Sequence, residues 1–315
     1  MEKQEIIKLC DEYGIVPKHI EMLRMNDRVL AKIESDQVYF LKGEKADKAY
    51  WETCCVYSNF LLEHGMNVTQ YEKSNYDTYA VEVGDKVFSL ERSLAGEPIE
   101  VLTDKEIMEI GRLLGIQHSL SIKYPTPFYI ATSWSLFGGN QTDEIGDYDE
   151  NELSFLDFMK RYEAHPLFLK IESLYREYRQ SIYKLWDVLP QGAVQGDFCY
   201  YNMLQEKNGS IAIYDFNLAG NEVYLNECIA VGIYHAWHAP YKGKLNEEER
   251  FQVFIDSYIN ERSFNEMEQA VFLQLKAIIR AFRYDRIEEG ISLKDEDEQN
   301  QFLQDTLLIL EGAKS

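Results

Sequence analysis

Two aspartates and an asparagine are the side chains of residues 193–219 that are best suited to do chemistry. This stretch reads AVQGDFCYYNMLQEKNGSIAIYDFNLA. Asp197 is followed five residues later by Asn202, and Asp215 follows a second apolar run. The asparagine-glycine pair at 208–209 lies between the two, and this pair predicts a hairpin because both residues tolerate positive φ. The hairpin would return Asp215 towards the other two side chains. Such converging oxygen atoms suit a magnesium-nucleotide site with a carboxylate near an attacking hydroxyl.

The order Asp-x-x-x-x-Asn, hairpin, Asp-Phe is that of the protein-kinase catalytic loop and metal-binding segment. With Gln195-Gly196 before Asp197, the stretch resembles the superfamily of aminoglycoside phosphotransferases, choline kinases and type II homoserine kinases. The resemblance continues through residues 221–237. In two places the chain departs from the pattern. Gln195 stands where the family usually has histidine, and Asn217 stands where protein kinases have glycine.

The resemblance implies an α+β, protein-kinase-like fold with two lobes. Residues 1–94 would form a small β-sheet lobe that binds nucleotide, and residues 95–315 a larger, mostly helical lobe with the catalytic loop, metal site and acceptor pocket. Hydrophobic periodicity and turn residues agree with this order of elements. They predict an N-terminal helix over 3–13, a five-stranded sheet drawn from runs within 20–42 and 68–90, a helix over 46–64, and later helices near 103–118, 153–165, 166–188, 228–237, 266–287 and 296–310.

The same resemblance assigns roles in phosphoryl transfer. Asp197 would orient the acceptor hydroxyl and take its proton, while Asn202 and Asp215 would hold Mg²⁺. Lys42, which closes the third expected strand, would contact the phosphates of ATP. Its acidic partner would be Glu52 in the following helix, with Glu63 as the alternative.

Two further segments would bind the nucleotide. The loop 25–28, which contains Asn26, takes the place that protein kinases fill with a glycine-rich loop, and it has no glycine. A strand exit at Glu91, Arg92, Ser93 and Leu94 is the expected hinge between the lobes. Its backbone N–H and C=O groups would bind the adenine edge, although a plain edge strand fits the local residues equally well.

The acceptor pocket has four candidates by resemblance to homoserine-kinase-like proteins: Glu222, Glu227, His235 and Trp237. The acidic segment 138–152 either gathers a positively charged substrate or is a solvated connector. His118, near the end of an expected helix, is interpreted as a packed structural histidine.

Composition limits the possible partners. A net charge of −22 over 315 residues opposes binding to nucleic acid or to an anionic membrane, and it favours cationic small molecules. The five cysteines show no Cys-x-x-Cys spacing, which indicates a reducing compartment. No window approaches the ~18 apolar residues of a membrane span, so we expect a cytoplasmic protein.

Together these features predict an ATP- and Mg²⁺-dependent enzyme. It would move the γ-phosphoryl group to a hydroxyl of a small, amino-bearing molecule such as an aminoglycoside, choline or homoserine. The alternative is a non-catalytic, kinase-like binding or structural protein, as some spore-coat kinase-like proteins are. The pattern names neither one acceptor nor an oligomeric state.

Overall fold

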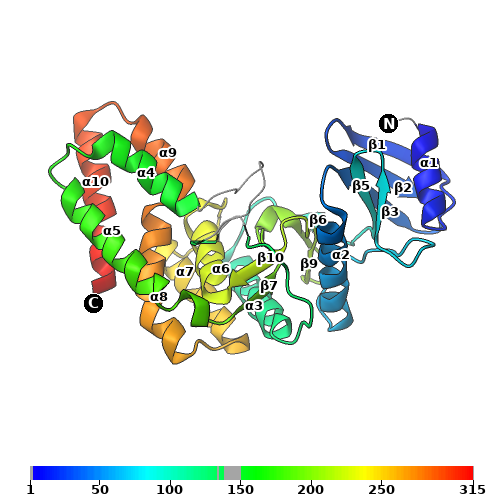
Figure 1. The fold of residues 1–315 in the computed structure, drawn as a ribbon. Coiled ribbons are helices and arrows are strands. Elements are labelled where there is room, and N and C mark those ends of the chain that lie inside the picture. Colours follow the sequence, from blue (N-terminus) through cyan, green and yellow to red (C-terminus); the bar gives the residue numbers. More distant parts are fainter. Residues whose placement is uncertain (1–2, 133–134, 138–149, 315) are drawn as a thin grey trace. The chain divides into compact units, whose positions relative to one another are not determined.

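The computed structural model describes residues 3–132, 135–137 and 150–314 (Figure 1). Its contacts divide the chain into two compact units. The first unit comprises Met1–Glu100, Lys123–Phe128 and Tyr201–Ala219, and the second comprises Val101–Ile122, Tyr129–Tyr200 and Gly220–Ser315. The predicted lobes, 1–94 and 95–315, are a different division and stay a prediction.

A five-stranded antiparallel sheet forms the centre of the first unit, as the sequence predicts. The segment around Val68 and Tyr71 was expected to be a strand, but it forms only isolated bridges, to Ile213 and Glu91. The strands follow the order β1 (His19–Met25), β2 (Val29–Glu34), β3 (Val38–Glu44), β5 (Lys86–Arg92) and β4 (Ala80–Val83).

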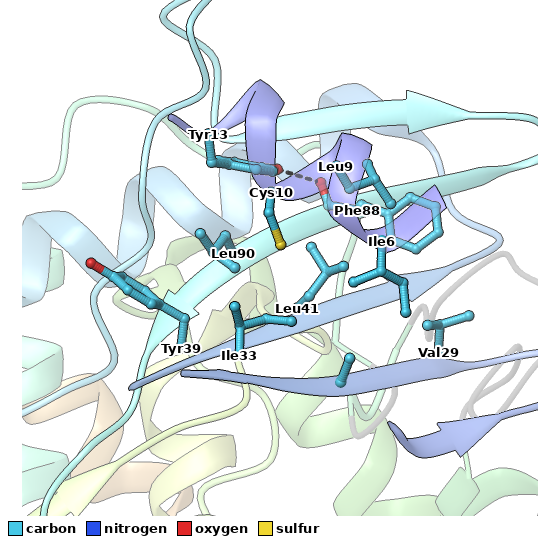
Figure 2. Packing of buried hydrophobic residues seen from close by; sticks show 11 residues of the cluster. Ile6, Leu9, Cys10, Tyr13, Val29, Ile33, Tyr39, Leu41, Phe88 and Leu90 are labelled. Atoms are coloured by element: carbon cyan, nitrogen blue, oxygen red, sulfur yellow. Dashed lines mark hydrogen bonds between the residues drawn. The ribbon is translucent and has the colours of Figure 1, made fainter. Parts of the chain in front are cut away.

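The helix α1 (Lys3–Glu12) covers one face of this sheet. Figure 2 shows Ile6, Leu9 and Cys10 of α1 packed against Ile33 and Leu41 of the strands. The hydroxyl of Tyr13 donates to the backbone oxygen of Phe88 at 2.9 Å, which attaches the end of the helix to β5. Because side chains alternate along a strand, the neighbours of these core residues point to the opposite face.

The helix α2 (Lys48–Glu63) begins at the N-cap Asp47, whose side chain accepts from Tyr50 N at 2.8 Å. It ends before Gly65, whose φ of +92° favours glycine. Trp51 and Cys55 pack it against the edge of the sheet.

The predicted catalytic hairpin is present in the first unit. It consists of β8 (Met203–Gln205) and β9 (Ile211–Ile213), with β6 (Glu97–Pro98) beside β8. In the turn, Gly209 N donates to Glu206 O at 2.9 Å, and Gly209 has a φ of +89°. Asn208 does not share the positive φ expected of it, because the loop is longer than the two-residue turn that needs it at both positions.

The second unit is mostly helical. A short ribbon of β7 (Gln191–Val194) and β10 (Gly220–Val223) carries the start of the catalytic loop. Gly111 allows α3 (Asp104–Ser121) to approach α7 (Glu247–Glu261) closely, since a Cβ there would lie 2.3 Å from Phe254 O. The helices are α3 (Asp104–Ser121), α4 (Glu150–Tyr162), α5 (Phe168–Tyr183), α6 (Tyr224–Ile233), α7 (Glu247–Glu261), α8 (Glu266–Ala281), α9 (Tyr284–Ser292) and α10 (Glu296–Glu311).

Three predicted helix boundaries are wrong. The expected helix 266–287 is two helices, because Phe282 leaves helical geometry and Arg283 adopts an extended conformation. The expected helix 166–188 ends at Tyr183 and is followed by a short 3₁₀ turn at Trp186–Val188. The expected helix 228–237 begins earlier, as α6, and continues as a π-helical turn, Tyr234–His238. Within the described residues, no helix is both long and apolar enough to span a membrane.

Candidate active site

Lys42 is the centre of a charged cluster in the first unit. Its Nζ lies 3.1 Å from Glu91 Oε1 and 3.4 Å from Asp215 Oδ1. Strand register explains the first contact. Lys42 on β3 is paired with Ser89 on β5, and Glu91 is two residues further on, so its side chain projects from the same face. The hairpin supplies Asp215, which follows β9.

Burial and charge act in opposite directions on this cluster. Burial by itself lowers the pKa of Lys42, but the carboxylates of Glu91 and Asp215 outweigh it and hold that pKa above its usual value. Burial raises the pKa of Glu91, and Lys42 offsets this only in part. Lys42 therefore stays charged at neutral pH, as a phosphate ligand must.

The predicted ion pair between Lys42 and Glu52 is wrong. Glu52 instead accepts hydrogen bonds from Tyr79 N at 2.9 Å and Ala80 N at 2.7 Å, at the start of β4. By accepting from two backbone amides, this carboxylate fixes the chain where it enters β4. Glu91 takes the place that we expected Glu52 to fill.

A pocket of about 340 Å³ opens on the face of the sheet that carries Lys42. Its apolar lining comes from the sheet and the catalytic hairpin, and its size and lining suit a purine ring. The lining includes Leu30, Phe40, Leu94, Leu204 and Tyr214.

The expected hinge lies in the wall of this pocket, but its amides are not equally available. Arg92 N donates to Gln70 O and Ser93 N to Val38 O, both at 2.9 Å. These two amides are therefore used within the chain, contrary to the prediction. Leu94 N makes no hydrogen bond to the described parts of the chain, so it is the hinge amide that a base could use.

A second, smaller pocket of about 110 Å³ shares Leu30 and Lys42 with the first. Of its lining residues, Arg24 was not singled out in the sequence, and Arg28 was included only as part of the loop 25–28. Asn26 was singled out, but its Oδ1 accepts from Arg28 N at 3.0 Å and so shapes the β1–β2 turn. The remaining polar lining comes from Glu44, Asp215 and Asn217.

The hairpin places the two predicted metal ligands at one of its ends. Tyr214 N, next to Asp215, donates to Asn202 O at 3.0 Å. Asp215 has a φ of +64°, a conformation that a non-glycine residue rarely adopts and that often marks a functional site. One carboxylate and one amide oxygen fit Mg²⁺, which keeps several waters and takes its other oxygens from nucleotide phosphates. No cluster of three or more His, Cys, Asp or Glu residues able to hold a metal occurs in the described ranges.

In the second unit, buried side chains hold the loop before Asp197. Gln195, which is fully buried, accepts from Asp197 N at 2.8 Å through Oε1. Glu227 accepts from Gly196 N at 3.2 Å, and Gly196 has a φ of +82°. Gln195 therefore has a structural role, since its amide oxygen fixes the backbone of the residue expected to act as base.

The two glutamates expected in the acceptor pocket are buried. Glu227 Oε2 lies 2.6 Å from His118 Nε2, and His118 Nδ1 lies 2.7 Å from the Tyr258 hydroxyl. Glu222 accepts from the Thr132 hydroxyl at 2.6 Å. Burial raises the pKa of both glutamates to about 8 and lowers that of His118, so each group favours its neutral form. The interpretation of His118 as a structural residue agrees with these contacts.

The other two acceptor candidates lie in the π-helical turn. His235 is fully buried, and its Nδ1 lies 2.8 Å from Val231 O. Trp237 is half-buried, and the guanidinium of Arg280 lies 4.3 Å from the centre of its ring. A direct contact of these residues with an acceptor stays a prediction. Most of the acidic segment 138–152 lies outside the described residues.

The chain matches no protein-family model and no curated protein. Its fold, in contrast, matches many solved structures. Amicoumacin kinase hAmiN, in complex with AMP-PNP, Ca²⁺ and Ami, shares 14% identity with a TM-score of 0.63, covering 99% of this chain and 94% of that one. An aminoglycoside phosphotransferase from Alicyclobacillus acidocaldarius subsp. acidocaldarius DSM 446 shares 11% identity with a TM-score of 0.61, covering 100% and 93%.

Spectinomycin phosphotransferase, in complex with ADP and spectinomycin, shares 11% identity with a TM-score of 0.57, covering 100% of this chain and 99% of that one. At such identities the similarity establishes the fold. The predicted protein-kinase-like α+β fold is thus confirmed, and the chain has the fold of the aminoglycoside phosphotransferases.

Proposed function

We propose that this chain is an ATP-dependent phosphotransferase that moves the γ-phosphoryl group to a hydroxyl of a small molecule. The observation that carries the proposal is the cluster of Lys42, Glu91 and Asp215, whose residues line two pockets that share Leu30 and Lys42. The larger pocket suits a base, and the smaller is lined by three cationic side chains and two carboxylates. Solved structures of the same fold include kinases of small molecules with AMP-PNP or ADP bound.

Four residues of the chain would have separate roles in this reaction. Lys42 holds phosphate oxygens, and Asp197 accepts the proton of the acceptor hydroxyl as its oxygen bonds to the γ-phosphorus and ADP leaves. Asn202 and Asp215 would hold Mg²⁺, which supplies neutralisation of charge on the phosphates. These are positioning and electrostatic roles, so no covalent intermediate with the protein is needed.

We further propose that the acceptor is an amino-bearing molecule and that the protein acts in the cytoplasm. The net charge of −22 supports a cationic acceptor and opposes nucleic acid as a partner. Aminoglycoside-like sugars, choline and homoserine remain the acceptors to test first. The lobe of residues 95–315 would hold them, with Glu222, Glu227, His235 and Trp237 as pocket candidates.

Thermal unfolding with ATP tests the nucleotide site. A ligand that binds only the native state stabilises it by about 2.7 kcal/mol at a hundredfold excess over its Kd. We expect ATP to raise the Tm of the wild type further when Mg²⁺ is present. Asp215→Asn should remove this extra rise, and asparagine tolerates the positive φ at this position.

A turnover assay distinguishes an enzyme from a non-catalytic kinase-like protein. Asp197→Asn should keep ATP binding within a few-fold and lower ADP release with an acceptor at least about a hundredfold, because only the proton acceptor is lost. If ATP raises the Tm but no acceptor in the screen stimulates ADP release, the non-catalytic kinase-like protein becomes the better interpretation. If millimolar ATP leaves the Tm unchanged, the proposed nucleotide site is wrong.

A further inference from the structure

A β-bulge in β1 determines which face of the sheet Arg24 occupies. Met22 is paired with Ala31 and Arg24 with Leu30, so Leu23 is an extra residue without a partner of its own. Met22 packs against the core under α1. Strict alternation would place Arg24 on that same face, two residues later. The bulge moves it to the opposite face.

Arg24 thereby joins a row of side chains across the sheet. Leu30 is paired with Arg24 on one side and with Lys42 on the other, so all three project from the face that carries the two pockets. Arg24 has no ion-pair partner among the residues described. The bulge thus places the Arg24 guanidinium in the same cross-strand row as Lys42. This arrangement suits a ligand that both side chains contact.

Arg28 reaches the same small pocket from the β1–β2 turn. Its Nε lies 2.9 Å from Glu44 Oε2, and its side chain is 46% exposed. The turn itself is held in place. Asn26 and Arg28 bond to each other, and Lys86 Nζ donates to Asp27 O. The hydrogen-bond donors of this short, anchored turn are arginine side chains, whereas those of a glycine-rich loop are backbone amides.

The charge of the small pocket contrasts with that of the chain. Arg24, Arg28 and Lys42 face the carboxylates of Glu44 and Asp215, so cations are in excess there although the whole chain carries −22. Guanidinium groups bind phosphate oxygens through paired N–H donors. A polyphosphate is therefore the anion that this pocket suits.

We propose that Arg24 and Arg28 bind the distal phosphates of the nucleotide; this inference rests on the proposed ATP site. The two pockets share Leu30 and Lys42. A nucleotide with its base in the larger pocket therefore passes Lys42 before it reaches the arginines. Arg24 and Arg28 recognise the phosphates that distinguish ATP from AMP, and the bulge at Leu23 places Arg24 on the face where these phosphates bind.

Calorimetric titration of ATP and of AMP, both with Mg²⁺, tests this assignment. Arg24→Gln and Arg28→Gln should each weaken ATP binding about tenfold, as expected for loss of one charge-assisted contact. AMP binding should stay within about twofold, because AMP does not extend to the arginines. Arg176→Gln removes the same charge from an exposed helical pair with Glu172 and should change neither affinity.

A double variant separates contact from overall charge. Arg28→Gln with Glu44→Gln leaves the net charge of the pocket unchanged, so recovery of wild-type ATP affinity would show that Arg28 only neutralises Glu44. We expect ATP binding to remain weak. ATP affinity within twofold of the wild type in both single variants, or equal losses for AMP, would overturn the assignment while leaving the ATP site intact. A wild type that binds neither nucleotide would contradict the proposed function as well.

Discussion

Lys42 Nζ lies 3.1 Å from Glu91 Oε1, although the residue directly paired with Lys42 on the neighbouring strand is Ser89. The ion pair thus runs diagonally across two strands of one sheet. Its geometry is set by strand register and does not depend on the position of a helix. The cation that we expect to hold phosphates is therefore fixed by the sheet that forms the wall of the base pocket.

Exchange of the two glutamates for glutamine should separate their roles. Glu91→Gln removes the carboxylate that holds Lys42 Nζ in place, and we expect ATP binding to weaken about tenfold, because the loss of this fixed position outweighs the removal of one negative charge. Glu52→Gln keeps one oxygen that can accept from both Tyr79 N and Ala80 N, as Oε2 does, but it loses the carboxylate charge that strengthens these hydrogen bonds. It should lower the free energy of unfolding by about 1–2 kcal/mol and leave ATP affinity unchanged. Titration calorimetry and urea unfolding measure both; the reverse pattern would restore Glu52 as the partner of Lys42.

Gln195 should matter for stability because its amide oxygen satisfies a backbone amide at a buried position. Gln195→Ala leaves Asp197 N without this acceptor, and we expect a loss of about 1–3 kcal/mol in urea unfolding. Gln191→Ala is the matched control. This glutamine is exposed on the same ribbon, so its replacement should change stability by less than about 0.5 kcal/mol. Equal effects of the two variants would contradict the role given to Gln195.

The pH dependence of stability should reveal the buried carboxyl of Glu227. Burial raises its pKa from 4.5 to about 8, with the Gly196 amide opposing the shift and Asp197 adding to it. Folding therefore favours the protonated form. The contribution to stability is complete below pH 4.5 and is lost as the pH rises towards 8, at up to about 1.4 kcal/mol per pH unit.

Glu227→Gln keeps an oxygen that can accept from Gly196 N, but it does not titrate. The free energy of unfolding of the variant, relative to the wild type, should therefore rise between about pH 5 and about pH 8. Urea unfolding at several pH values measures this difference, and Glu222→Gln should behave alike because its pKa is also raised by burial to about 8. A difference that stays constant over this range would show that Glu227 is ionised throughout.

Gly43, next to Lys42, should resist any larger residue. A Cβ built there would lie 2.1 Å from the ring of Phe88, the residue paired with it on β5. Gly43→Ala should therefore cost about 1–3 kcal/mol of stability through overpacking. Phe88→Leu in the same chain should recover part of this loss, which a double-mutant cycle in urea would measure as a coupling. Purely additive effects would show that the ring is not the obstacle.

The family resemblance of residues 193–219 implied the α+β fold, and local patterns agreed with it and predicted the hairpin. Alternating apolar residues predicted the antiparallel strands, and the asparagine-glycine turn predicted that Asp215 returns towards Asn202. Such signals act between residues close in the sequence, so the chain reveals them without knowledge of its packing. The exact φ of Asn208 was missed because one turn residue is compatible with more than one loop length.

The amino-acid sequence alone therefore determined which side chains are available for the proposed phosphoryl transfer, Lys42, Asp197, Asn202 and Asp215 among them. Tertiary structure decided their partners. Glu91 rather than Glu52 meets Lys42 because strand register joins segments nearly fifty residues apart, and no local pattern encodes it. In the same way, the unpaired Leu23 turns Arg24 to the pocket face. A side chain's face and neighbours depend on pairing between distant strands, and a single extra residue reverses them.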